Sequence, residues 1–152
     1  MTGGTRLRRG RALGIDLGSR RIGIAVSDSA GTMALPRGTV VRTGDADRDR
    51  RALVELVLEA EAVVVVVGLP LSLDGSRGPA ATAAGTEADA LRVLLEDHGI
   101  PVELFDERLT TVTAHQALAA AGSSERKRRS MIDETAAAVM LSAWLEGSGG
   151  QR

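Results

Sequence analysis

Apolar residues alternate with small or polar residues in two short stretches between residues 12 and 28. The apolar positions are Leu13, Ile15, Leu17, Ile22, Ile24 and Val26. A period of two predicts β-strands, and residues 18–21, which begin with a glycine, supply a turn between them. The pattern therefore predicts a β-hairpin with Asp16 inside its first strand. A carboxylate there is costly unless it is paired or binds a cation, although an Asp at a strand end can also cap a turn.

Farther along, the pattern predicts strands that alternate with helices. The expected elements are a strand over 32–43, a helix from Asp45 or Asp47 to about Ala60, a strand over 62–67, a helix over 79–97, a strand over 101–105, a helix over 111–121, a flexible basic loop over 122–130 and a last helix over 131–145. Pro36 confines its strand to an edge or to its first half. The run Ala62–Val67, with five consecutive valines, is typical of a parallel strand buried on both faces.

Strands joined by a hairpin are antiparallel, and strands joined through a helix are parallel. The order of elements therefore predicts an α/β fold, with a mixed five-stranded sheet and helices on both faces. We expect a single domain over residues 11–146, with flexible tails over 1–10 and 147–152. Sites in such sheets lie off the carboxyl ends of the parallel strands, where Asp16, Gly68 and Glu107 fall.

Composition narrows the function classes. The chain of 152 residues is 43% apolar and has no cysteine and two histidines, so disulfides, thiolate metal sites and a zinc cluster are not expected. No apolar run approaches the roughly 20 residues that cross a bilayer, and no apolar segment marks a secretory signal. We therefore expect a cytoplasmic protein without membrane association.

Charge is unevenly distributed although the net charge is only -1. Basic residues cluster at 6–11, at Arg20 and Arg21, and at 126–129. Such clusters can bind phosphate, but a solvated charged surface is the ordinary alternative. The aromatic content of 1% argues against recognition by stacking of bases.

Three carboxylates on separate elements stand out: Asp16, Glu107 and Asp133. Asp133 opens the last helix on the apolar stripe that continues through Ala136, Ala137, Met140 and Trp144. An acid in a first helical turn also interacts favourably with the helix dipole, which is the plainer reading of Asp133 alone. Three converging carboxylates fit an oxygen-ligand site for Mg²⁺ or Mn²⁺. Two such ions, roughly 3.5–4 Å apart, support phosphodiester hydrolysis.

Four segments carry a resemblance to a known family: GIDLGSRRIGIAVSD, VVGLPLSLDGSRGPAA, FDERLTTVTAHQAL and IDETAAAVMLSAWL. In this order and spacing, from about Leu13 to Leu145, they resemble the YqgF/RuvX family. Its members are RNase H-like nucleases described as Holliday-junction resolvases and as pre-16S rRNA nucleases. The resemblance implies an RNase H-like sheet of order 3-2-1-4-5 with strand 2 antiparallel. It also implies that Asp16, Glu107 and Asp133 are the catalytic and metal-binding residues.

The implied function is a metal-dependent endonuclease that processes the 5′ end of pre-16S rRNA. Resolution of branched DNA junctions is the alternative, and a non-catalytic nucleic-acid-binding module is a second one. An actin-like or sugar-kinase-like ATPase also begins with a hairpin carrying Asp-x-Gly, but it needs a second half for which this length leaves no room. We expect a monomer or a weak homodimer, because no large apolar patch is evident.

Further residues are expected to bind substrate. The loop over 69–78, with Ser72 and Arg77, is predicted to contact phosphates, or else is a plain connection between a strand and a helix. Arg108 contacts substrate or pairs with Asp106. The run of Arg126, Lys127, Arg128 and Arg129 precedes Asp133 and is expected to bind phosphate.

Overall fold

The fold was analysed in a computed structural model, which describes residues 10–110 and 125–149, and side chains over 10–110 and 135–147. The helix expected over 111–121 lies outside the described residues. The strands are β1 (Arg11–Leu17), β2 (Arg21–Ser27), β3 (Ala34–Val41), β4 (Ala62–Leu69) and β5 (Val102–Asp106). The α-helices are α1 (Ala46–Glu59), α2 (Pro79–Leu95) and α4 (Glu125–Gly149), with 3₁₀ turns η2 (Glu96–His98) and η3 (Glu107–Leu109).

The strands form one five-stranded sheet of order β3-β2-β1-β4-β5. β2 pairs antiparallel with β1 and β3, whereas β4 pairs parallel with β1 and β5. The predicted order, the antiparallel second strand and the buried parallel valine strand are therefore confirmed. Pro36 lies in β3, which is an edge strand as expected.

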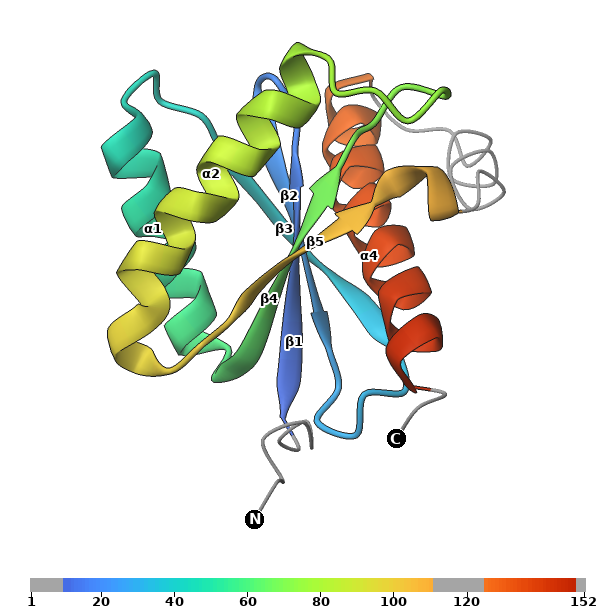
Figure 1. Cartoon of the computed structure of the whole chain (residues 1–152). Helices are drawn as coiled ribbons and strands as arrows, with labels where there is room; N and C mark the ends of the chain where they lie inside the picture. The colour runs from blue at the N-terminus through green and yellow to red at the C-terminus, as the bar shows by residue number, and fades with distance from the viewer. Residues whose placement is uncertain (1–9, 111–124, 150–152) are drawn as a thin grey trace.

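Helices cover both faces of the sheet, with α1 and α2 on one face and α4 on the other (Figure 1). Alternate residues of each strand enter the two cores, because successive side chains point to opposite faces. Leu13, Ile15, Val65 and Val67 pack toward α1 and α2, whereas Ala12, Val64 and Val66 pack toward α4.

The face under α4 is built from small residues, which lets the helix approach closely. A Cβ added at Gly14 would lie 3.1 Å from Leu141 Cβ and 3.5 Å from the Ala137 carbonyl oxygen. At the far end of α4, Trp144 Nε1 donates to Glu103 Oε1 at 3.1 Å, near the start of β5. α4 therefore runs from the carboxyl end of the parallel strands toward their amino end.

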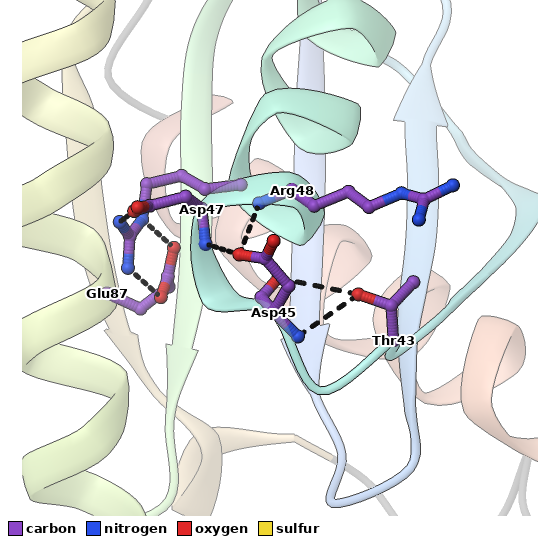
Figure 2. Close-up of polar contacts among 6 residues, drawn as sticks. Thr43, Asp45, Asp47, Arg48 and Glu87 are labelled. Atoms are coloured by element: carbon purple, nitrogen blue, oxygen red, sulfur yellow. Dashed lines mark hydrogen bonds and ion pairs between the residues drawn. The ribbon is translucent and has the colours of Figure 1, made fainter.

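Polar contacts fix the start of α1 and its distance from α2 (Figure 2). Asp45 is the N-cap, and its side chain accepts from the amides of Asp47 and Arg48 at 3.1 and 3.2 Å. Arg50 donates from Nε and Nη2 to the Glu87 carboxylate at 2.7 and 3.0 Å, which joins α1 to α2.

The boundaries of the last helix differ from those expected from the sequence. α4 begins at Glu125 and continues to Gly149, so the predicted flexible loop is wrong over residues 125–130 and the predicted tail is wrong over residues 147–149. Glu, Arg and Lys are strong helix formers, which accounts for the earlier start. Among the described helices, none has both the length and the apolar character of a membrane span.

Candidate active site

The carboxyl ends of β1, β4 and β5 bring two predicted carboxylates to one edge of the sheet. Ile15 pairs with Val67, and Gly68 pairs with Phe105. Asp16 therefore lies at the level of Gly68, and Glu107 follows β5 directly. The register brings residues that are 91 positions apart (107 minus 16) in the chain to neighbouring strand ends.

Asp16, Gly68 and Glu107 all lie on the side of the sheet that faces α4. Asp16 has the same parity as Ala12 in β1, and Gly68 has the same parity as Val66 in β4. Phe105 packs in the same core, and Glu107 lies two residues beyond it. The two carboxylates thus share the face that the last helix covers.

Gly68 provides the space in which the Glu107 carboxylate lies. A Cβ added at Gly68 would lie 2.5 Å from Glu107 Oε1 and 2.9 Å from Glu107 Cδ, closer than real contacts allow. Only a glycine at this point of β4 lets the Glu107 side chain cross the strand end toward Asp16. The sequence signal for this role was the glycine at the end of an otherwise β-branched strand.

The two carboxylates interact directly, and their electrostatics are unfavourable when both are ionised. The pKa of Glu107 is raised from 4.5 to about 8, by burial first and then by the hydrogen bond with Asp16 and the negative charges of Asp16 and Asp106. Apart from the proton that Glu107 shares with Asp16, no N–H or hydroxyl group of the described residues donates to either side chain. A cation is the group that would neutralise this pair.

Asp133 lies on α4, and only its backbone is described. It is one turn before Ala137, which lies over Gly14, and Asp16 is two residues beyond Gly14 in the same direction. The backbone of α4 therefore passes the pair at the level of Asp133. Among the described side chains, no group of three acidic or histidine residues forms a metal site, so the third ligand stays a prediction.

Arg108 makes the intramolecular contacts that were the alternative to substrate binding. Its guanidinium donates to both carboxylate oxygens of Asp106, at distances of 2.7–3.0 Å, and to the Leu73 carbonyl at 3.3 Å. The hydrogen bond and charge of Arg108 lower the pKa of Asp106. Arg108 thereby links η3, which carries Glu107, to the loop between β4 and α2.

The loop over residues 70–78 uses several of its amides internally. The amide of Ser72 donates to the Ser76 carbonyl at 3.0 Å, the amide of Gly75 to the Ser72 carbonyl at 2.8 Å, and the amide of Ser76 to Asp74 Oδ1 at 2.9 Å. The amides of these three residues therefore already have partners within the loop, and the predicted contact of the loop with phosphate stays a prediction. The Ser72 and Arg77 side chains are exposed, and Arg77 Nη1 lies 3.0 Å from the position of a Cβ at Gly85.

The basic run over residues 126–129 is helical and lies in the first turns of α4. Its side chains lie outside the described residues, so its predicted contact with phosphate stays a prediction.

One residue of this end of the sheet was not predicted: Arg42, which reaches the β1–β2 turn and donates from Nε to the Gly18 carbonyl at 2.7 Å. Because Arg42 follows the third strand, no local pattern signals this contact.

Solved structures with the same fold include the Thermus thermophilus RuvC structure, with a TM-score of 0.54 and 17% identity over 92% of this chain and 96% of that one. The same protein in complex with a Holliday junction substrate gives a TM-score of 0.56 and 18% identity over 93% and 96%. At these identities the likeness concerns the fold, which is RNase H-like as predicted.

Sequence relatives are much closer. A Mycobacterium sp. (strain KMS) protein named "Putative pre-16S rRNA nuclease" is 48% identical over 138 residues, which cover 91% of this chain and 80% of that protein. A Rhodococcus opacus (strain B4) protein of the same name is 48% identical over 141 residues, covering 91% and 78%. A family model described as "RuvX: Holliday junction resolvase" matches residues 10–147. The chain belongs to this RuvX family, as its four motifs predicted.

Proposed function

We propose that this protein is a metal-dependent endonuclease that hydrolyses phosphodiester bonds at the 5′ end of pre-16S rRNA. The observation that carries the proposal is the Asp16–Glu107 pair, which faces α4 at the carboxyl end of the parallel strands. The names of the relatives at 48% identity support the RNA substrate.

The residues at the site fit a divalent cation of the Mg²⁺ or Mn²⁺ type. Asp16 and Glu107 offer hard oxygen ligands, and Asp133 on α4 is the proposed third ligand. When bound, such ions activate water and stabilise the leaving oxygen in phosphodiester hydrolysis. The contribution of the chain is to hold the carboxylates on three separate elements around one point.

Resolution of branched DNA junctions is a second candidate, favoured by the description of the family model. A junction must be cut on two symmetry-related strands, which requires two sites about a two-fold axis. We infer a monomer or weak homodimer in isolation, which is sufficient for one cut in a precursor RNA. A non-catalytic binding module is the least supported reading, because it has no use for an uncompensated acidic pair.

Cleavage of both nucleic acids by the purified protein tests the proposal. A 5′-extended 16S rRNA precursor fragment and a four-way DNA junction would each be incubated with Mg²⁺, with Mn²⁺ and with excess chelator. We expect metal-dependent cleavage of the RNA and none with chelator. Cleavage that survives the chelator contradicts the mechanism, and paired symmetric nicks in the junction without RNA cleavage favour the resolvase.

The proposed substrate contacts are Ser72, Arg77, Arg108 and the run Arg126, Lys127, Arg128 and Arg129. Neutralising the run should weaken binding and flatten its salt dependence by about one slope unit for each lost phosphate contact. An unchanged slope would assign these residues to a solvated surface.

A further inference from the structure

The turn between β1 and β2 brings together three arginines from two parts of the chain. The amide of Gly18 donates to the Arg21 carbonyl at 3.0 Å, which closes the turn around Ser19 and Arg20. The amide of Arg42 donates to the Arg20 carbonyl at 2.9 Å, and Arg42 Nε donates to the Gly18 carbonyl at 2.7 Å. We call this unit, Gly18–Arg21 with Arg42, the hairpin tip.

The hairpin tip has a concentration of positive charge that no carboxylate of the described residues neutralises. Arg50, Arg92 and Arg108 each form ion pairs with aspartate or glutamate. None of the three tip arginines has such a partner among the described residues. Arg20 and Arg42 are exposed and Arg21 is half-buried, so the tip lies at the surface of the described residues.

The geometry of the tip is fixed at its base. A Cβ at Gly18 would lie 2.5 Å from the Arg21 carbonyl oxygen, so the close turn requires a glycine at that point. The bond from Arg42 Nε uses one donor and leaves the two terminal amino groups of that guanidinium. A fixed guanidinium is well suited to phosphate, because its planar fork donates two parallel hydrogen bonds.

The tip lies close to the acidic pair. Gly18 and Arg21 are two and five residues beyond Asp16, and at about 3.3 Å per residue along a strand the tip begins within roughly 7 Å of Asp16. Arg21 also has the same parity as Gly23, which pairs with Asp16, so both face the α4 side.

We propose that the hairpin tip binds the phosphodiester backbone of RNA next to the bond that is cut. The inference rests on the proposed nuclease function and adds to it a second binding surface, on the opposite side of β1 from β4 and β5. Arg20 and Arg21 contact phosphates, and Arg42 both contacts phosphate and holds the turn in place.

Binding of RNA to the full chain, measured as a function of salt, tests the inference. Fluorescence anisotropy would use a labelled hairpin RNA with a single-stranded 5′ extension, and all variants would also carry Asp16→Asn so that the RNA stays intact. The test variant is Arg20→Gln with Arg21→Gln. The matched control is Arg11→Gln with Arg37→Gln, which removes the same charge from exposed positions of β1 and β3 outside the tip.

We expect the tip variant to bind at least tenfold more weakly at 100 mM salt and its salt slope to fall by about 1.5 units, because two phosphate contacts are lost. The control should change the slope by less than half as much. Equal slopes in the two variants, with unchanged thermal melting, overturn the inference.

A second variant, Arg42→Lys, keeps the charge but loses the bond from Nε to the Gly18 carbonyl. We expect an intermediate loss of affinity with an unchanged salt slope, and a loss of slope equal to that of the double variant would contradict the role of Arg42 in the turn.

The outcomes also separate the two proposals. If the native protein fails to cleave RNA while the tip variant loses slope, the nuclease proposal fails and the tip stands as an RNA-binding surface. If the native protein cleaves RNA and the slopes of the tip variant and the control match, the tip alone fails.

Discussion

Asp49 in α1 and the Asp16–Glu107 pair at the sheet edge are acidic groups withdrawn from solvent, yet their surroundings differ. Asp49 is only 7% exposed. It accepts from the Thr43 amide at 3.1 Å and from Thr43 Oγ1 at 2.7 Å, in the first turn of a helix, where the dipole favours negative charge. Its environment supplies the donors that a buried carboxylate needs.

The Asp16–Glu107 pair receives no such donors from the described residues, and each carboxylate faces the other. The pKa of Glu107 is raised to about 8, by burial first and by Asp16 second. A buried acid with matched donors stabilises the fold. Two acids that face each other lower stability, and they can serve the protein only by binding a ligand. The comparison separates a carboxylate that the fold satisfies from a pair that we propose to be functional.

The largest expected effect is on catalysis. Asp16→Asn keeps the shape of the side chain but removes a ligand charge, and we expect it to lower the single-turnover cleavage rate by about 10³-fold, or roughly 4 kcal/mol. Asp49→Asn, as the control, should change the rate of the folded protein by about twofold or less. An Asp16→Asn protein that cleaves within tenfold of the native rate would remove Asp16 from the site.

Gly68→Ala tests the space that the pair requires. The new Cβ would displace the Glu107 carboxylate, and we expect cleavage to fall by about 10- to 100-fold while the melting temperature changes little, because the displaced atoms end a flexible side chain. Gly78→Ala is the matched control, since a Cβ there meets nothing within 4 Å. Equal cleavage rates in the two variants would show that Glu107 is not confined by Gly68.

Substitutions at Asp49 and at Asp16 should change the free energy of unfolding in opposite directions. Asp49→Ala leaves the Thr43 donors unsatisfied and is expected to lower the free energy of unfolding by about 2 kcal/mol, measured by denaturant titration. Asp16→Asn should leave it unchanged or raise it, because the repulsion within the pair is relieved. Asp47→Ala, at a side chain that is 83% exposed, serves as the control. Similar losses for Asp49→Ala and Asp47→Ala would contradict a structural role for Asp49.

The smallest effect concerns pH in the absence of metal. The folded protein holds the Glu107 proton up to about pH 8, whereas the unfolded chain releases it near 4.5. The unfolded state therefore binds fewer protons between these values, and the free energy of unfolding should fall as pH rises through this window. We expect a fall of about 1 kcal/mol relative to Glu107→Gln, since solvent reaches the half-buried site. Parallel pH profiles of the two proteins would show that the pair carries no such cost.

Much of the framework was predictable from local patterns. Alternation fixed the hairpin, the valine run indicated the buried parallel strand, and the crossover helices placed Asp16 and Glu107 at carboxyl ends of parallel strands. The start of α4 was not predicted, because the Gly and Ser residues at 122–124 and the basic run after them look like a loop, although Glu, Arg and Lys favour a helix. Likewise, the pattern could not decide whether Arg108 pairs with Asp106. The structure shows this ion pair, and the contact of Arg108 with substrate stays a prediction.

The sequence by itself determined the hairpin, the parallel strands and the helices on both faces, because these follow from periodicity along the chain. Its four local motifs determined the family, and the resemblance to that family implied the order of the strands. Only the tertiary structure decided that the Glu107 side chain lies over Gly68 beside Asp16, and that Arg42 closes the hairpin tip. These contacts join residues 24 to 91 positions apart. Their existence depends on strand register and on clearances of a few tenths of an ångström, and neither is written in any local pattern.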